Sequence, residues 1–231
     1  MRALLRTTLV VLTVLATVGI TVPPGQASDW AERAQRRLNR LGCNAGPADG
    51  SIETRSRTAI IRFQAANGLA QNGHLTDTTR KRLYAERQVR CDARPVAGKA
   101  TGRRIVISQR QNYVWLVRSN GNVVAQGGMI DNPSVLARGT YRTGSKCGRP
   151  AKVRNNSDLS GELRLQNFVR FAPCGIGFHR IPQYWSNGAQ IHPDFLLGTN
   201  YKESHGCIRV SRAMSFRIWD FASIGTKVVV V

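Results

Sequence analysis

The sequence predicts two domains of different class: a small all-α N-terminal domain of three helices and a mainly β C-terminal domain with one short helix. Apolar residues recur at helical spacing between Trp30 and Leu83, whereas short β-branched and aromatic runs dominate after Gly102. A segment of Pro, Gly and small residues without apolar periodicity separates the two regions. With 231 residues, 42% of them hydrophobic, the chain is long and apolar enough for packed domains.

Three helices are expected in the N-terminal region. The apolar residues from Trp30 to Leu41 follow a helical period that stops at Gly42, and a second periodic set runs from Ala59 to Leu69. An internal repeat indicates the third helix, because Ala48 to Ile60 is echoed by Gln71 to Leu83 at an offset of 23 residues. Each copy contains an Asp-Gly or Asn-Gly turn followed by a helix start.

The C-terminal region is predicted to form strands, then one helix, then a last strand. The strand runs are Ile105 to Ile107, Tyr113 to Val117 and Val123 to Ala125. Asn120-Gly121 joins the second and third runs and is a strong hairpin signal. Phe216 to Phe221 has helical spacing, and Val228 to Val231 is a continuous apolar run, typical of a strand buried on both faces.

These patterns divide the chain into four parts. We expect a signal peptide over residues 1–27, the helical domain over 28–92, a linker over 93–102 and the β domain over 103–231.

The first segment has the composition of a secretory signal. Arg2 and Arg6 precede an apolar stretch from Thr7 to Val22, and small residues fit cleavage after Ala27. As a helix, that stretch would span roughly 24 Å, less than a hydrocarbon core of about 30 Å. We therefore expect an exported protein without stable membrane insertion after cleavage, with an uncleaved anchor as the alternative.

The chain is strongly basic, with 34 Lys and Arg against 13 Asp and Glu and a formal charge of +21. Such a charge attracts many polyanions, so it identifies partners poorly. Two explanations of the charge stay open. It reflects either a GC-rich genome with a generally basic protein surface, or selection for binding to an anionic wall or membrane surface. Nucleic acid is not expected, because the basic residues are scattered and no aromatic-interleaved binding motif is present.

Five cysteines in an exported chain leave one unpaired when the others form disulfides. Cys43 and Cys91 bracket the helical region, while Cys147 and Cys174 both lie in the β region. Pairing within each region is the simplest of the three connectivities for four cysteines, and it leaves Cys207 as a free thiol.

The candidate chemistry lies in the run Ser204-His205-Gly206-Cys207-Ile208-Arg209. A thiol is a useful nucleophile as a thiolate, and at an ordinary pKa near 8.5 it needs a base close by. Histidine is that base in most such sites, and the β region holds His179, His192 and His205. Gly206 allows the backbone to turn its amides toward a developing oxyanion.

The helical region resembles the peptidoglycan-binding-like domain family, a three-helix module often attached to cell-wall enzymes. The resemblance rests on Gln35-x-x-Leu38, Leu41-Gly42, Asp49-Gly50, Thr58-Ala59-Ile60, Phe63-Gln64, Gly68-Leu69, Asn72-Gly73 and Leu83. Glu53 and Thr54 stand where the family usually has an aromatic residue and Gly-Pro. The resemblance implies peptidoglycan binding, and a helical spacer without a ligand is the alternative.

The run from Ser204 to Arg209 resembles the signature of the L,D-transpeptidase catalytic domain family, and the likeness extends from about Arg103 to Val231. Further matches are Ile105 to Val117, Gly139-Thr140-Tyr141 and Gly225-Thr226-x-Val228. The resemblance implies an L,D-transpeptidase-like β-sandwich and Cys207 as the nucleophile. It also implies that His205 and Gly206 shape the oxyanion hole, and that Arg209 fixes the loop or meets the substrate carboxylate.

The family's base is a histidine upstream of the signature, which matches Gly177-Phe178-His179. Here 24 residues separate His179 from Ser204, more than the family's usual spacing, and Arg180 replaces a Ser or Gly. His192 is the alternative base, although Pro193 holds it in extended geometry. The extra residues would form a longer lid, with Tyr184 and Trp185 as either cleft lining or core.

Family resemblance implies a reaction without metal or organic cofactor. Cys207 would attack the third residue of a peptidoglycan stem peptide, and an amine of a second stem would resolve the thioester into a cross-link between third residues. Carbapenems would be inhibitors, and we expect a monomer in the cell wall of a bacterium. An L,D-carboxypeptidase acting through the same acyl-enzyme and an inactive wall-binding protein are the alternatives.

Two other kinds of site fit the residues less well. A zinc site built from His179, His192, His205 and Cys207 lacks the short ligand pairs typical of such sites. A papain-like hydrolase would place its cysteine before its histidine, whereas Cys207 comes last.

Overall fold

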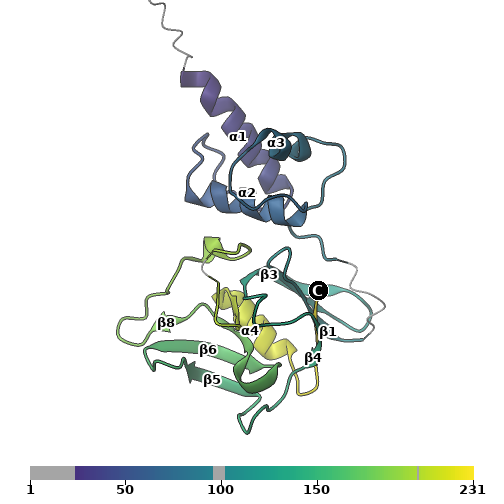
Figure 1. The fold of residues 1–231 in the computed structure, drawn as a ribbon, viewed down its shortest axis with the longest axis vertical. Helices are drawn as coiled ribbons and strands as arrows, with labels where there is room; N and C mark the ends of the chain where they lie inside the picture. The colour runs from purple at the N-terminus through teal and green to yellow at the C-terminus, as the bar shows by residue number, and fades with distance from the viewer. Residues whose placement is uncertain (1–23, 96–101, 202) are drawn as a thin grey trace, which may run out of the picture.

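The computed structural model describes residues 24–95, 102–201 and 203–231. The chain forms a helical part and a β part, which Figure 1 shows one above the other, and hydrogen bonds join the two parts. The predicted signal segment lies outside the described residues, except that residues 24–27 begin the first helix. None of the helices in the described ranges is long and apolar enough to cross a membrane.

The N-terminal part, here called the helical module, has the three predicted helices. They are α1 (Pro24–Arg40), α2 (Thr54–Ala66) and α3 (Asp77–Leu83). Their apolar faces meet in a core centred on Leu38, Ile60 and Phe63, which are fully buried. The disulfide Cys43–Cys91 closes this module beside that core, in the pairing that the sequence favoured.

The C-terminal part, which the sequence predicts to be catalytic and which is called the catalytic domain below for that reason, is mainly β with one α-helix. Its strands are β1 (Arg104–Ser108), β2 (Tyr113–Val117), β3 (Val123–Ile130), β4 (Gly139–Arg142), β5 (Lys152–Ser157), β6 (Leu163–Arg170), β7 (Gly177–Arg180), β8 (Gln183–Tyr184), β9 (Ile208–Val210) and β10 (Lys227–Val230). Two 3-10 helices, η1 (Pro173–Gly175) and η2 (Asp194–Leu196), and the α-helix α4 (Arg212–Phe221) complete it.

The strands form one continuous sheet in the order β4-β10-β1-β2-β3-β9-β7-β6-β5, with β8 paired to β6. The predicted hairpin is the antiparallel pair β2 and β3. The predicted last strand is β10, which lies between β4 and β1 and is buried, as expected for a strand covered on both faces. Helix α4 begins earlier than predicted because the Ser211 hydroxyl accepts a hydrogen bond from Met214 N–H and caps it.

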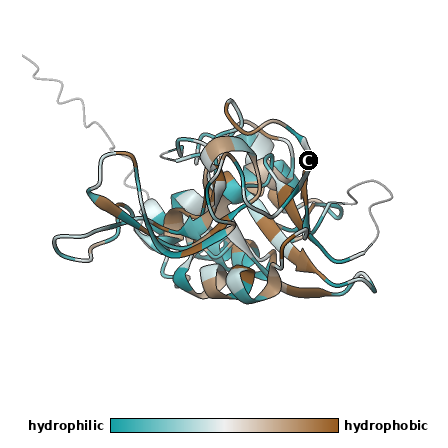
Figure 2. Cartoon of the chain, turned by 90° about the horizontal axis from the view of Figure 1, so that it is seen from below, coloured by the Kyte–Doolittle hydropathy of each residue, from teal (hydrophilic) through white to brown (hydrophobic). Residues whose placement is uncertain are grey.

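The two halves of the sheet share one apolar core. Residues of β1, β2 and β10 in one half pack with residues of β6, β7 and β9 in the other, and α4 lies in the same core. Large members of the core are Ile105, Leu116, Phe171, Phe178 and Ile218. In Figure 2 the apolar colour is concentrated on these strands, whereas the connecting loops are mostly hydrophilic. This arrangement is the expected mainly β sandwich with a short helix.

The helical module and the catalytic domain meet through polar contacts near the predicted linker. Trp115 Nε1 donates to the carbonyl of Asp92 at 3.3 Å, and Gln111 Nε2 donates to the carbonyl of Ala93 at 2.9 Å. Arg110 also reaches the carbonyl of Ala66, at the end of α2. The start of the predicted linker is therefore attached to the catalytic domain rather than extended away from it.

Candidate active site

The run of residues singled out by the sequence forms the loop that enters strand β9. Ser204 is buried, and its N–H donates to the carbonyl of Asp131 at 3.2 Å. Asn132 Nδ2 donates to the Ser204 carbonyl at 2.9 Å, so the segment after β3 holds the loop on both sides. Sequence reasoning missed Asp131 and Asn132, because a contact across 72 positions leaves no local signal.

Gly206 forms the tight turn of this loop. Its φ is +115°, a backbone conformation that side chains other than glycine rarely adopt, and its N–H donates to Ser204 Oγ at 3.0 Å. A Cβ at this position would lie 2.8 Å from Val135 Cγ1 and 3.4 Å from Ile176 Cδ1. The turn before Cys207 therefore requires glycine for its backbone angle and for the space around it.

Sheet register sets the predicted base close to the loop of the predicted nucleophile. Phe178 pairs with Ile208 in the parallel β7–β9 ladder, and both side chains belong to the core. Because neighbouring side chains on a strand alternate between faces, His179 and its ladder partner Arg209 both lie on the opposite face. Cys207 directly precedes β9 and is two positions from Arg209, so its backbone lies near the strand of His179.

His179 is held rigidly on this face. It is buried, and its ring stacks on Phe168 with centroids 5.9 Å apart and planes inclined by 9°. Its Nδ1 lies 2.6 Å from the Arg180 carbonyl. A carbonyl oxygen can only accept, so Nδ1 carries the proton in the neutral ring and Nε2 keeps the lone pair that a base needs.

Cys207 is the free cysteine, and it is partly exposed. Its thiol donates to the Gly175 carbonyl at 3.4 Å, at the end of η1. The disulfide Cys147–Cys174, in the pairing that the sequence favoured, ties η1 to the loop after β4. The second disulfide therefore supports the backbone that contacts the sulfur.

The surroundings of Cys207 and His179 favour the neutral form of both side chains. Burial raises the pKa of the Cys207 thiol, and the Gly177 N–H, Arg170 and Arg209 offset this only in part. Burial also lowers the pKa of His179 to about 4, against the hydrogen bond to Arg180. At neutral pH the site therefore holds a neutral thiol and an unprotonated imidazole, a combination suited to proton transfer from sulfur to nitrogen.

Arg170 is a basic residue near the sulfur that sequence reasoning missed. It pairs with Gly177 across the β6–β7 ladder, and its charge lowers the pKa of Cys207. Its side chain is buried, and its Nε donates to the Pro150 carbonyl at 3.1 Å. Together with Arg209, which pairs with His179, it gives the reacting face a positive potential.

The alternative base, His192, has a different setting. It is buried before η2, and its Nδ1 lies 3.1 Å from the carbonyl of Pro193. It does not belong to the β7–β9 ladder that carries His179 and leads to Cys207. The register of the β7–β9 ladder therefore favours His179 over His192 as the base for the Cys207 thiol.

The structure does not bring Tyr184 to the sulfur. Tyr184 pairs with Leu163 at the start of β6, seven residues along that strand from Arg170. At about 3.3 Å per residue this separation is on the order of 20 Å. Tyr184 and Trp185 are both exposed on this hairpin, so neither is part of the core, and a substrate-binding or loop-orienting role for Tyr184 stays a prediction.

His205 stands between buried Ser204 and Gly206 but is itself exposed. Its ring is therefore accessible to a ligand at the mouth of the site. Among the described residues, no group of three or more His, Cys, Asp or Glu side chains is arranged to hold a metal ion. The candidate zinc ligands thus do not come together as a cluster.

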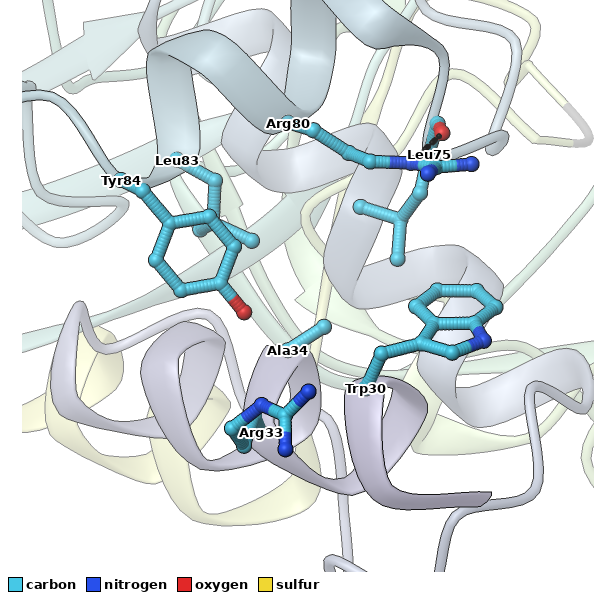
Figure 3. A pocket seen from close by; sticks show the side chains of 7 residues that line it. All are labelled: Trp30, Arg33, Ala34, Leu75, Arg80, Leu83 and Tyr84. Carbon is cyan, nitrogen blue, oxygen red and sulfur yellow. Dashed lines mark hydrogen bonds between the residues drawn. The ribbon is translucent and has the colours of Figure 1, made fainter. Parts of the chain in front are cut away.

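A hollow lies in the helical module. It has a volume of about 150 Å³ and is lined by Trp30, Arg33, Ala34, Leu75, Arg80, Leu83 and Tyr84. Figure 3 shows Trp30 and Tyr84 on opposite sides of the hollow, with Arg80 near the indole ring. The Arg80 guanidinium carbon lies 5.2 Å from the centre of that ring. Trp30 and Leu75 also line an adjoining hollow of about 320 Å³.

Comparison with known proteins assigns both parts of the chain. Residues 31–83 match the peptidoglycan binding domain family, and residues 102–230 match the L,D-transpeptidase catalytic domain family. No curated protein is significantly similar in sequence. The fold is similar to the crystal structure of an L,D-transpeptidase from Xylanimonas cellulosilytica, at 22% identity and a TM-score of 0.50 over 87% of this chain and 93% of that chain.

Two further solved structures are similar at lower TM-scores. One is an L,D-transpeptidase from Stackebrandtia nassauensis, with 17% identity and a TM-score of 0.48 over 89% of this chain and 92% of that chain. The other is L,D-transpeptidase 1 from Mycobacterium tuberculosis, with 20% identity and a TM-score of 0.39 over 56% of this chain and 62% of that chain. The catalytic-domain match spans more than half of the sequence, and this protein therefore belongs to the L,D-transpeptidase catalytic domain family.

Proposed function

We propose that this protein is an exported L,D-transpeptidase that cross-links peptidoglycan stem peptides through a thioester on Cys207. The observation that supports the proposal is the β7–β9 register, which pairs His179 with Arg209, two residues after Cys207, in a chain of this family. A neutral histidine with Nε2 unprotonated beside a neutral thiol is suited to general-base activation of the sulfur.

The proposed first step forms the acyl-enzyme. Cys207 Sγ attacks the carbonyl carbon of the third stem residue while His179 Nε2 takes the thiol proton. The carbon–nitrogen bond to the terminal D-alanine then breaks, and the proton passes from His179 to the leaving amine. The Cys207 N–H is the proposed oxyanion donor, because Ser204 and Gly206 hold the turn that presents it.

The second step resolves the thioester. A side-chain amine of a second stem attacks the thioester carbon, the carbon–sulfur bond breaks, and the amine proton returns through His179 to the sulfur. Arg209 lies on the same face and is the proposed contact for a stem carboxylate. If water replaces the amine, the same intermediate gives an L,D-carboxypeptidase. A chain that binds wall without acylation is the remaining alternative.

Muropeptide analysis distinguishes these activities. Purified residues 28–231 are incubated with muropeptides that carry tetrapeptide stems, and the products are identified by mass spectrometry. Dimers joined through two third residues are the expected result. Products with tripeptide stems and no dimers would indicate a carboxypeptidase. Unchanged substrate in the presence of folded protein would contradict the enzymatic proposal and favour a wall-binding protein.

We further propose that the hollow beside Trp30 is the peptidoglycan contact of the helical module. Sugar rings stack on exposed aromatic faces, and Trp30 is 37% exposed between two hollows. Arg33 and Arg80 line the same hollow and could meet the carboxylates of stem peptides. This proposal rests on the match of residues 31–83 to the peptidoglycan binding domain family.

Replacing Trp30 with alanine should weaken binding to isolated sacculi by about tenfold, since stacking on one ring contributes on the order of 1–2 kcal/mol. Trp185→Ala is the matched control, because Trp185 is similarly exposed but lies in the catalytic domain. Cosedimentation with sacculi measures both variants. Equal binding by Trp30→Ala and the unmodified chain would contradict a peptidoglycan contact at Trp30 and favour a helical spacer without a ligand.

A further inference from the structure

Arg62, on helix α2, is buried where the helical module meets the catalytic domain, with 8% of its surface exposed. Its Nη1 donates to the Cys43 carbonyl of its own module at 2.9 Å. Its Nη2 donates to the carbonyls of Phe195, at 2.6 Å, and Leu197, both in the catalytic domain. Burial lowers the pKa of Arg62 to about 10, so it is still charged at neutral pH. A buried charge is costly unless it is partnered, and these three carbonyls are its partners.

The two acceptors in the catalytic domain belong to the segment that links base and nucleophile. We call residues 181–201 the crossover segment, since it follows the strand of His179 and precedes Ser204. Phe195 lies in η2 and Leu197 directly follows it. The last carbonyls of a helix have no partner within that helix, and a cationic side chain satisfies them well. In Figure 1 the later, yellow-green part of this segment lies below α2, and η2 contacts that helix.

The fit around Arg62 depends on two glycines. Gly198 has a φ of +90°, and a Cβ there would lie 2.7 Å from Arg62 Nε. On the other side, a Cβ on Gly128 would lie 2.7 Å from the Leu197 carbonyl oxygen. Gly198 N–H donates to the carbonyl of Met129, on β3, at 2.9 Å. The crossover segment is therefore held between Arg62 and β3 with no room for an added methyl group.

Strand β3 connects this contact to the nucleophile. Met129 pairs with Val210 and Ile130 pairs with Arg209, both on β9 directly after Cys207. The carbonyl of Asp131, just after β3, accepts the Ser204 N–H. At Leu197 the crossover segment thus lies next to the strand that supports the nucleophile loop. A displacement of the segment there would act on that strand.

We infer that Arg62 is a positioning residue through which the helical module holds the crossover segment, and with it the Cys207 loop, in the reactive arrangement. The inference rests on the proposed function. Every candidate catalytic side chain follows the predicted linker, so the site residues alone give no reason to expect this dependence on the helical module. In this view the helical module is required for full acylation even when the substrate is a small soluble molecule.

The test compares Arg62→Met with Arg55→Met in the full chain. Arg55 lies on the same helix but is exposed and bonds Asn44 within the module. Acylation by a carbapenem is followed by mass spectrometry over a range of drug concentrations. This separates the first-order rate constant of acylation from the apparent affinity for the drug. Arg62→Met should lower the rate constant by about tenfold or more, because small misplacements of reacting groups are costly. Arg55→Met should match the unmodified chain.

Hydrogen exchange on the unliganded protein gives a readout that does not depend on catalysis. Amides of residues 194–201 should exchange faster in Arg62→Met but not in Arg55→Met. Arg62→Lys, which keeps the charge but has fewer donors, should restore part of both properties. Unchanged acylation in Arg62→Met, or equal loss in Arg55→Met, would overturn the inference. If the unmodified chain forms no adduct, the proposed function fails, and the exchange data still decide whether Arg62 orders the segment.

A second variant probes the contact from the catalytic domain. Gly198→Ala should slow acylation, because the new Cβ meets Arg62 Nε and the φ of +90° disfavours any side chain. Combined with Arg62→Ala, its effect should be smaller than in the presence of Arg62, since the truncated side chain leaves space for the methyl group. Independent, multiplicative effects of the two changes would show that they do not act through a shared contact, and would contradict the inference. If Arg62→Met does not fold, Gly198→Ala, which keeps Arg62, carries the test, and unchanged acylation in this variant would contradict the inference.

Discussion

Replacing Cys207 with serine should abolish the carbapenem adduct, which in the unmodified chain is expected as a mass increase of one drug molecule. The β-lactam presents a strained acyl group to the thiol, and ring opening leaves a stable thioester. A serine hydroxyl has a far higher pKa than a thiol, so a histidine that is neutral at pH 7 cannot activate it to the same degree. We expect acylation to fall by about 10³-fold or more.

The controls for this variant concern the fold. Cys207→Ser should keep both disulfides and its thermal transition, because Cys207 is free and partly exposed. Peptide mapping under non-reducing conditions checks the pairing. An adduct that persists in Cys207→Ser would mean that another residue is the nucleophile. A Cys207 disulfide in active protein would contradict both the pairing and the mechanism.

Replacing His179 with alanine should slow acylation by roughly 10²-fold or more, which is the usual scale of a general-base contribution. The unmodified chain should hold its rate from pH 8 to about pH 5 and lose it toward pH 4, as His179 becomes protonated at its lowered pKa of about 4. In His179→Ala, the acylation rate should depend only on the fraction of Cys207 that is ionised to the thiolate. Because the pKa of Cys207 is raised, the residual rate should increase about tenfold per pH unit through neutral pH.

His192→Ala is the matched control, since both rings are buried and both bond the following carbonyl through Nδ1. It should change the acylation rate and its pH profile much less than His179→Ala. Stopped-flow or mass-resolved acylation over pH 4 to 9 measures all three proteins. If His192→Ala is the crippling change and His179→Ala is mild, the base is His192 while the nucleophile is unaffected.

Local sequence patterns were sufficient for most elements of the fold. The Asn120-Gly121 turn predicted the β2–β3 hairpin, and the apolar run at the C-terminus predicted a buried strand. Periodicity and the internal repeat predicted all three helices of the module. These signals are local, because turn propensity and apolar spacing depend on residues within a few positions of one another. The start of α4 was predicted too late, because its cap at Ser211 lies outside the apolar period.

The candidate site was predictable where its residues are contiguous. Ser204 to Cys207 form one loop, so the thiol, the glycine turn and the buried serine could be identified together. Asp131, Asn132 and Arg170 could not, since each reaches the site by strand pairing or by a hydrogen bond between distant segments. The position of Tyr184 was not predictable for the same reason, since its pairing with Leu163 at the start of β6 joins distant segments, and its role in substrate binding stays a prediction.

The sequence by itself determined the two domains, the free thiol at Cys207 and the family to which the chain belongs. Tertiary structure alone decided that β7 pairs His179 with Arg209, two residues after that thiol, and that Arg62 of the helical module bonds the segment between histidine and thiol. The physical reason is that propensity, turn chemistry and motif spacing act along the chain. Strand register and the burial of a charge depend on groups brought together from more than a hundred residues apart, as Arg62 and Leu197 are.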